Sequence, residues 1–405
     1  MSTLLWPGDH RAGSLMSDAA LVEAMVAVEQ AWLDALVATG VAPESASRHR
    51  LSADSRSEAS VSADSALDPA EVEAGGNPVI PLVRALRAAL PDHAAPWVHR
   101  GLTSQDVLDT ALVLCARDAV EAVRRELGDQ ITLLVALAEE HRETAMLART
   151  LTQPALPTTF GAKAATWLHA VLDADDALAA LRWPVQLGGA AGTLAAPVEL
   201  AGVEGGRQLR GLIAAGLDLD GGAPWHTRRT TVTALGDAAV TATDGWGRIA
   251  NDVLALGRPE IGELRDGSAG GSSAMPHKAN PTLAVLVRRA ALAGPPLAST
   301  LHLAAAAQVD ERADGGWHVE WQTLALLLRR TVVAAAQTTG LLRGLGVDTD
   351  RMAAHLAAFE DDLLAEQRSV AAVTGRPPAA TYRGLVDDLI DEALVRARTR
   401  LKEHP

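Results

Sequence analysis

The chain has 405 residues and a formal net charge of −14 at pH 7, with 36 Lys and Arg against 50 Asp and Glu. So acidic a chain lacks the basic surface that nucleic-acid phosphates require, and no nucleic-acid partner is expected. Hydrophobic residues make up 48% but aromatic residues only 3%, and a core of Ala, Leu and Val favours helices over strands. The composition therefore predicts an all-α protein, and the length predicts more than one domain.

The start of the chain and its cysteine content exclude further classes of protein. No basic region followed by an apolar run opens the sequence, so no secretory signal is expected. Arg288, Arg289 and Pro295 interrupt the most apolar region, 282–307, so no membrane-spanning segment and no membrane partner are expected. Cys115 is the only cysteine, which excludes an intrachain disulfide and a cysteine-based metal cluster. We therefore expect a cytoplasmic protein.

Helical spacing begins at Ser17, which can cap a helix whose apolar stripe ends before Gly40. Short helices and loops are expected over 41–80, and another short helix over 79–90. A long helix is predicted over 105–143, where Gly128 is the only Gly or Pro. Similar runs predict long helices at 158–182, 194–216, 229–256, 282–308 and 317–343.

Long helices with short connections are typical of a helix bundle. The sequence shows neither a Gly-rich phosphate turn nor alternating strands and helices, so a doubly wound nucleotide-binding fold is not expected. We predict three helical domains: an N-terminal domain over 1–95, a central bundle of long helices over 96–343, and a small C-terminal domain over 344–405.

The segment 267–281, with the sequence GSAGGSSAMPHKANP, combines small residues with reactive side chains. Its glycines and serines predict a mobile loop between two long helices. An ordinary flexible connection is the alternative interpretation. The density of Ser, His, Lys and Asn just before a helix favours a functional loop.

This loop resembles the signature sequence of the fumarase/aspartase superfamily over GSSAMPHKANP at 271–281. The stretches WVHRGLTSQDVLDTA at 97–111 and RTLTQPALPTTFG at 149–161 resemble the other two family regions, in the same order. The resemblance implies an all-α fold with a central long-helix bundle. It also implies a homotetramer whose active sites are each shared by three subunits, a small polycarboxylate substrate, and neither a metal nor an organic cofactor.

The family moves a proton on the carbon next to a carboxylate, through an intermediate whose extra negative charge needs preorganised donors and cations. By similarity Ser272 is the base or acid, and Lys278 stabilises its alkoxide or binds the substrate carboxylate. Ser273 stays open as the alternative reactive serine. Asn280 is expected to donate to an anion, and Met275 is expected to contact the substrate.

Six further candidates lie outside the loop, and four of them have a structural alternative. His99 either transfers a proton or is a structural histidine. Thr103 and Ser104, at the start of the predicted long helix, either bind a carboxylate or only cap the helix. Arg312 is either a carboxylate clamp or a salt-bridge residue. Two amides, Gln105 and Gln153, are expected to bind substrate.

Leu151 departs from the pattern of the purine and arginine lyases, which usually carry a proton-transferring His at this place. Other stretches resemble 3-carboxy-cis,cis-muconate cycloisomerases, namely 76–82, 187–195, 224–227 and 311–318. We therefore expect a cycloisomerase that forms 4-carboxymuconolactone, in the β-ketoadipate pathway of aromatic catabolism, by intramolecular carboxylate addition and protonation of the neighbouring carbon. Its leaving group in reverse is a carboxylate, which needs no dedicated acid.

Two alternatives remain at this point. An elimination lyase would release fumarate from adenylosuccinate, argininosuccinate, nitrosuccinate or a similar substituted succinate and would share every motif above. The residues around 359–362 and 380–382 do not resemble the usual cycloisomerase ending, which keeps this alternative open. A non-catalytic structural paralogue is the second alternative, disfavoured by an intact Ser272, Lys278 and Asn280.

Overall fold

The computed structural model describes residues 4–48, 50–52, 67–268, 270–271, 274–275, 277–379 and 381–403. Contacts divide the chain into two compact units. Unit 1 comprises Met1–Glu121, Ala180–Asp237 and Pro295–Arg330, and unit 2 comprises Ala122–Ala179, Ala238–Gly294 and Thr331–Pro405. The division into three domains stays a prediction.

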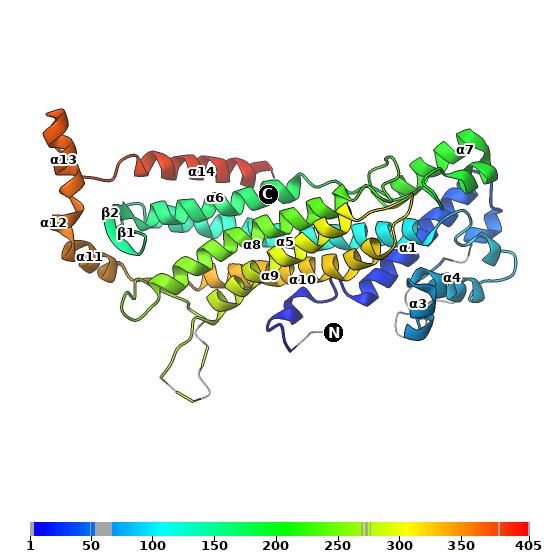
Figure 1. Cartoon of the computed structure of the whole chain (residues 1–405), viewed down its shortest axis with the longest axis horizontal. Coiled ribbons are helices and arrows are strands. Elements are labelled where there is room, and N and C mark those ends of the chain that lie inside the picture. The colour runs from blue at the N-terminus through cyan, green and yellow to red at the C-terminus, as the bar shows by residue number, and fades with distance from the viewer. Residues whose placement is uncertain are drawn as a thin grey trace. The chain divides into compact units, whose positions relative to one another are not determined.

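The chain is mostly helical, which confirms the predicted fold class (Figure 1). The long helices begin and end within a few residues of their predicted limits. Three short 3-10 helices are described, Asp9–Ala12, Glu44–Ser47 and Ala95–Trp97. Among the described residues, two short α-helices lie between the second and the third of them. The helices are α1 (Asp18–Ala38), α3 (Pro69–Gly75), α4 (Val79–Ala88), α5 (Ser104–Glu140), α6 (Phe160–Ala179), α7 (Ala195–Gly216), α8 (Thr230–Leu256), α9 (Thr282–Ala306), α10 (Gly315–Arg343), α11 (Thr349–Ala358), α12 (Glu360–Leu363), α13 (Ala365–Thr374) and α14 (Val386–Glu403).

Two short antiparallel strand pairs were not predicted. Strands β1 (Ala145–Thr150) and β2 (Gln153–Thr159) form a hairpin, and β3 (Leu264–Arg265) pairs with β4 (Gly346–Val347). The helix expected from residue 158 begins at Phe160 instead. Prolines at 154 and 157 fix φ and donate no backbone hydrogen bond, which disfavours helix through this segment.

The core of unit 1 forms where α1 packs on α7 and on the first half of α5. Ser17 caps α1 as predicted, because its side chain accepts a hydrogen bond from the backbone of Ala20 at 3.2 Å. Trp32 and Met25, on the apolar stripe of α1, are fully buried. Burying one such side chain stabilises a fold by about 2 kcal/mol.

Unit 2 is held by polar as well as apolar contacts between its helices. Trp246 of α8 donates from Nε1 to Gln130 of α5 at 2.8 Å, and Gln130 donates to the Ala335 carbonyl of α10 at 3.0 Å. The rings of Phe160 and Trp167, both fully buried, pack edge to face with centroids 5.7 Å apart. Helix α14 lies along α6 (Figure 1).

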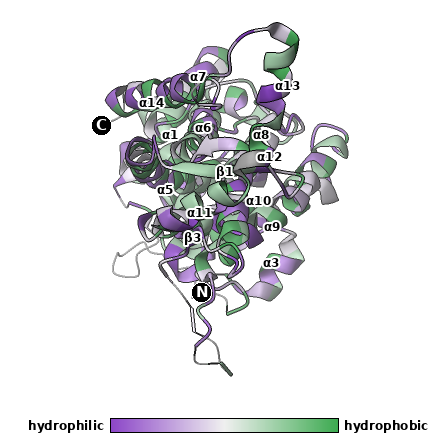
Figure 2. Ribbon diagram, turned by 90° about the vertical axis from the view of Figure 1, so that its left-hand side faces the viewer, coloured by the Kyte–Doolittle hydropathy of each residue, from purple (hydrophilic) through white to green (hydrophobic). Residues whose placement is uncertain are grey.

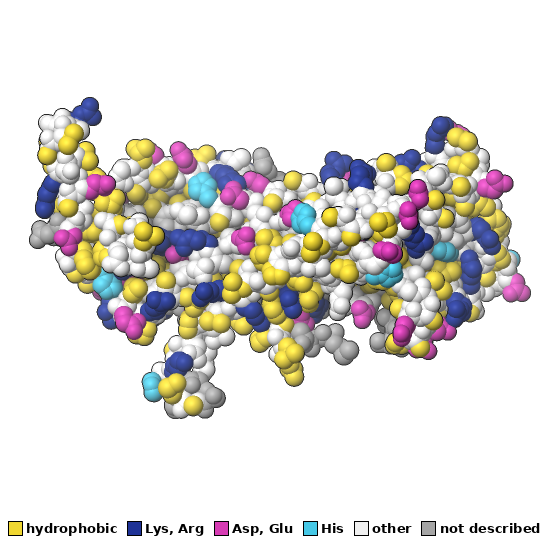
Figure 3. Space-filling view, in the orientation of Figure 1, with side chains coloured by type: hydrophobic (Ala, Val, Ile, Leu, Met, Phe, Trp, Pro, Cys, Tyr) yellow, Lys and Arg dark blue, Asp and Glu magenta, His cyan; other side chains and the backbone are white. Residues whose placement is uncertain are grey.

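The surface is mixed in charge and in hydropathy. Acidic and basic side chains are interspersed on the face drawn in Figure 3, and helices such as α14 carry hydrophilic and hydrophobic residues together (Figure 2). Within the described part of the chain, no helix is both long enough and apolar enough to cross a membrane.

Candidate active site

His99 lies in the turn that leads into α5, and its backbone has an unusual conformation. Its φ of 59° falls in the left-handed region, which is rare for a residue with a side chain. Trp32 of α1 donates from Nε1 to the carbonyl oxygen of Arg100 at 2.9 Å, which fastens this turn to α1. Such strained positions cluster at functional sites, so the geometry favours the functional interpretation of His99.

The carboxylate of Glu29 on α1 is the hydrogen-bond partner of His99. Its Oε1 lies 2.6 Å from Nδ1, and the Glu29 side chain is fully buried whereas that of His99 is 17% exposed. When Nδ1 carries a proton toward Glu29, Nε2 is the ring nitrogen left for a substrate. Glu29 was not predicted as a site residue from the sequence.

His99 and Ser104 line one cavity of about 360 Å³ in unit 1, so the structure brings these two predicted residues together. Arg84 and Arg87 of α4 line the same cavity. Arg84 lies 2.7 Å from Glu71 at the surface, and Arg87 donates to a backbone carbonyl at 2.9 Å. Guanidinium groups beside a serine and a histidine suit a carboxylate substrate. Neither arginine was predicted.

The side chain of Asp106 caps the N-terminus of α5. The backbone N–H of Thr103 donates to Oδ2 of Asp106 at 3.0 Å. The Thr103 hydroxyl accepts a hydrogen bond from Nη1 of Arg312 at 2.8 Å, which brings two more predicted residues together. The Arg312 guanidinium also lies over the Trp317 ring, 5.2 Å from its centroid. Arg312 has no carboxylate partner within the described residues, so these residues give the salt-bridge interpretation no support.

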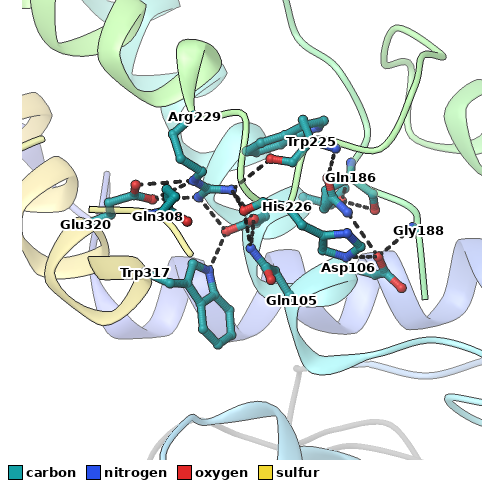
Figure 4. Close-up of polar contacts among 12 residues, drawn as sticks. Gln105, Asp106, Gln186, Gly188, Trp225, His226, Arg229, Gln308, Trp317 and Glu320 are labelled. Atoms are coloured by element: carbon teal, nitrogen blue, oxygen red, sulfur yellow. Dashed lines mark hydrogen bonds and ion pairs between the residues drawn. The ribbon is translucent and has the colours of Figure 1, made fainter. Parts of the chain in front are cut away.

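A buried polar network lies beneath the first turns of α5 (Figure 4). Gln105 is fully buried and donates to Asp109 at 3.1 Å and to the carbonyl of His226 at 2.9 Å. Arg229 lies 2.6 Å from Asp109 and 2.6 Å from Glu320. Burial by itself would lower the pKa of Arg229, but the two carboxylates raise it above its ordinary value. Gln105 therefore supports this network, and its contact with substrate stays a prediction.

Backbone hydrogen bonds join the two ends of the signature loop, which belongs to unit 2. Gly270 and Asn280 exchange two backbone hydrogen bonds of 2.9 Å, and the Asn280 side chain donates to the Gly271 carbonyl at 3.3 Å. Met275 and Lys278 are exposed. Ser272 and Ser273 lie outside the described residues, so their predicted roles rest on the sequence.

Leu151 lies at the tip of the β1–β2 hairpin. It forms the two-residue turn with Thr152, and their φ values are 47° and 71°. Glycine and asparagine are usual where both turn residues need a positive φ, so leucine is unusual here. Packing in the core does not explain it, because Leu151 is 96% exposed. The neighbouring Gln153 is exposed and donates to the Thr152 hydroxyl at 3.3 Å.

The predicted site residues are therefore divided between the two units. Unit 1 contains His99, Thr103, Ser104, Gln105 and Arg312, and unit 2 contains Gln153, Met275, Lys278 and Asn280. Among the described residues, no group of three or more His, Cys, Asp or Glu side chains could hold a metal ion. That the reaction needs no cofactor stays a prediction.

Comparison with known proteins places these residues in a family context. A protein-family model described as a lyase matches residues 12–293. A nitrosuccinate lyase of Streptomyces davaonensis is 42% identical over 393 residues, which cover 94% of this chain and 82% of the relative. A 3-carboxy-cis,cis-muconate cycloisomerase of Bradyrhizobium diazoefficiens is 40% identical over 301 residues, or 72% of this chain and 65% of the relative.

A solved structure shows the same family resemblance. The 3-carboxy-cis,cis-muconate lactonizing enzyme of Pseudomonas putida superposes with a TM-score of 0.80 and 30% sequence identity. The superposition covers 96% of this chain and 86% of that enzyme. The predicted resemblance is confirmed at the level of family and fold.

Proposed function

Because the chain belongs to the lyase family of the fumarase/aspartase superfamily, we propose that it eliminates a stable anion from a small polycarboxylate. The base removes a proton from the carbon next to one carboxylate. The bond from the adjacent carbon to the leaving group then breaks. The products are an unsaturated dicarboxylate and an anion that leaves without being protonated.

Leu151 is the observation that carries this proposal. An amine leaving group needs a proton as its bond breaks, and an acid such as histidine supplies it. In the family region at 149–161, the position that such a histidine would occupy is Leu151, at the exposed tip of the hairpin. Its hydrocarbon side chain cannot supply a proton. Nitrite and carboxylate are stable anions, so either leaves without such an acid.

Nitrosuccinate is the substrate that we propose first, with fumarate and nitrite as products. The similarity to the nitrosuccinate lyase extends over 94% of the chain. The similarity to the Bradyrhizobium cycloisomerase extends over 72%. This difference supports the elimination alternative, which the unusual C-terminal residues had kept open.

Lactonisation of 3-carboxy-cis,cis-muconate is the second candidate. It is the function expected first from the sequence, and it is favoured by the stretches at 76–82 and 187–195 and by the fold likeness to the Pseudomonas putida enzyme. In the reverse of this lactonisation, the leaving group is the substrate's own carboxylate. A carboxylate leaves without being protonated, so this reaction too needs no acid at the position of Leu151.

We assign the steps to residues as follows. Ser272 removes the proton, and Lys278 stabilises its alkoxide. The N-terminus of α5, with Thr103 and Ser104, binds a substrate carboxylate through hydroxyl and backbone donors. His99 faces the same cavity as Ser104 and orients the substrate. From the resemblance to the family, we propose that a homotetramer completes each site with loops from neighbouring subunits.

Two assays run in parallel decide between the candidates. The purified protein is incubated with nitrosuccinate, and nitrite and fumarate are measured. The loss of diene absorbance is followed with 3-carboxy-cis,cis-muconate. Equal release of nitrite and fumarate supports the first candidate, and loss of diene absorbance supports the second. Turnover of adenylosuccinate or argininosuccinate instead would contradict the absence of a leaving-group acid.

The serine assignment has its own test. Ser272→Ala is expected to abolish turnover while the oligomeric state and circular dichroism stay unchanged, because the hydroxyl is the base. Ser273→Ala is the matched control and is expected to retain turnover. The opposite result would move the base to Ser273.

A further inference from the structure

A second cavity lies within unit 2, and part of its lining comes from the stretch 149–161 that also contains Gln153. It has a volume of about 450 Å³ and is bounded by β1, β2, α6, α8 and the turn after α8. None of the residues assigned above to catalysis or substrate binding lines it. Four basic side chains do: Arg149, Lys163, Arg248 and Arg258.

One carboxylate forms ion pairs with two of these cations. Asp252 lies 3.5 Å from Nζ of Lys163 and 2.5 Å from Nη1 of Arg248. The indole of Trp167 also donates to Asp252 at 2.9 Å, which fixes the carboxylate in place. One negative charge therefore faces two positive charges, and part of the hydrogen-bonding capacity of Lys163 and Arg248 stays free for a ligand.

The other two arginines differ from each other. Arg149 makes a bidentate pair with the fully buried Glu263, at 2.7 and 3.0 Å, and His355 lies 2.7 Å from the same carboxylate. Arg258 is exposed, and no carboxylate of the described residues lies within ion-pair distance of it. Four cations against the carboxylates of Asp252 and Glu263 leave an excess of two positive charges around the cavity.

We propose that this cavity is a binding site for a small organic dicarboxylate, distinct from the catalytic site. The excess of two positive charges matches a dianion, and charge-assisted hydrogen bonds from Lys and Arg are the usual means of holding carboxylates. Apolar side chains of Met146, Leu147 and Ile261 form part of the lining. They suit the hydrocarbon between two carboxylates better than they suit inorganic phosphate.

The scarcity of lysine allows binding to be read at the cavity itself. The chain contains three lysines, Lys163, Lys278 and Lys402. Lys163 lies in the cavity and is 21% exposed, Lys278 lies in the signature loop, and Lys402 is exposed near the C-terminus. The full-length protein is treated briefly with an acetylating reagent at increasing succinate, and mass spectrometry measures acetylation of each lysine.

Succinate is expected to slow acetylation of Lys163 in a saturable way and to leave Lys402 unchanged. Protection of Lys278, if seen, reports the catalytic loop separately. Phosphate is the inorganic dianion for comparison, and neutral succinamide tests the need for charge. Protection by succinate at lower concentration than by phosphate supports the proposal. Stronger protection by phosphate, equal protection by succinamide, or no protection of Lys163 would overturn it.

Arg258→Gln tests the site without disturbing an ion pair. It is expected to raise the succinate concentration that half-protects Lys163 by about tenfold, the usual effect of losing one charge-assisted hydrogen bond. Arg376→Gln is the matched control, because it removes an exposed arginine of the same unit outside the cavity. An equal shift in both variants, or none in Arg258→Gln, would contradict the assignment. Both variants are expected to keep the basal activity.

Discussion

The carboxylate of Glu29 and the imidazole of His99 are joined across 70 positions of sequence by a 2.6 Å contact. Glu29 lies on the apolar face of α1, and its Oε2 is buried with no hydrogen-bond partner in the described residues. Burying a carboxylate with so few hydrogen-bond partners lowers the stability of the fold. The contact therefore has a directing role: it fixes which ring nitrogen of His99 faces the cavity beside Ser104.

Glu29→Gln is expected to lower kcat about tenfold while KM changes little. The amide keeps the volume but no longer dictates the tautomer of His99, so His99 orients the substrate less well and part of the rate gained by positioning is lost. Steady-state kinetics with the substrate that the two assays identify measure both constants. Glu23→Gln, on an exposed position of the same helix, is the control. A purely structural Glu29 would show itself as lost stability with kcat unchanged.

Leu151→Asn is expected to stabilise the protein by about 1 kcal/mol, because leucine at positive φ carries a strain of this size that asparagine largely avoids. The free energy of unfolding in urea measures the effect. Leu4→Asn removes a leucine that is 97% exposed but has no positive φ, so it is expected to change nothing. A destabilised Leu151→Asn would mean that the leucine packs against another subunit.

The long helices could be predicted because their signal is local and repeated. In α5 and α8, apolar residues keep a 3.6-residue spacing over many turns. The β1–β2 hairpin could not be predicted in the same way. Its strands are short, and its contacts with α11 and α12 come from residues about 200 positions away.

Several residues of the candidate site could be predicted from the sequence, but the residues that contact them could not. His99, Ser104 and Thr103 were identified by resemblance to family motifs. Arg84 and Arg87 were missed because only packing decides which face of α4 lines the cavity. Glu29 left a detectable signal, since a charged residue interrupts the apolar stripe between Met25 and Trp32. That it meets His99 is a matter of tertiary structure alone.

Cys115 is expected to resist thiol reagents in the native protein. Burial, helped by nearby Asp118, raises the pKa of its thiol to about 12. The reactive thiolate is therefore negligible at pH 8. Ellman's reagent should detect no thiol in the folded protein and one per chain in urea. Rapid reaction of the folded protein would show that α5 opens locally around this residue.

Asp175 of α6 is expected to make the stability of unit 2 sensitive to acid. Burial by itself would raise the pKa of Asp175, but Arg400 of α14 and Arg124 of α5 outweigh it and hold the pKa below its ordinary value. Arg124 lies 3.0 Å away. A depressed carboxyl pKa contributes stability that is present above the unfolded-state value, about pH 4, and is lost as the pH falls through the lower folded-state value.

Asp175→Asn is therefore expected to cost about 3 kcal/mol at neutral pH, because two arginines lose a buried partner. The difference from the unsubstituted protein should narrow below about pH 4. Urea unfolding followed by circular dichroism at several pH values measures it. Asp173→Asn is the control: this residue pairs with Arg396 but its side chain is 62% exposed, so a change within about 0.5 kcal/mol is expected. A difference that stays constant as the pH falls would show that Asp175 contributes through packing and not through its charge.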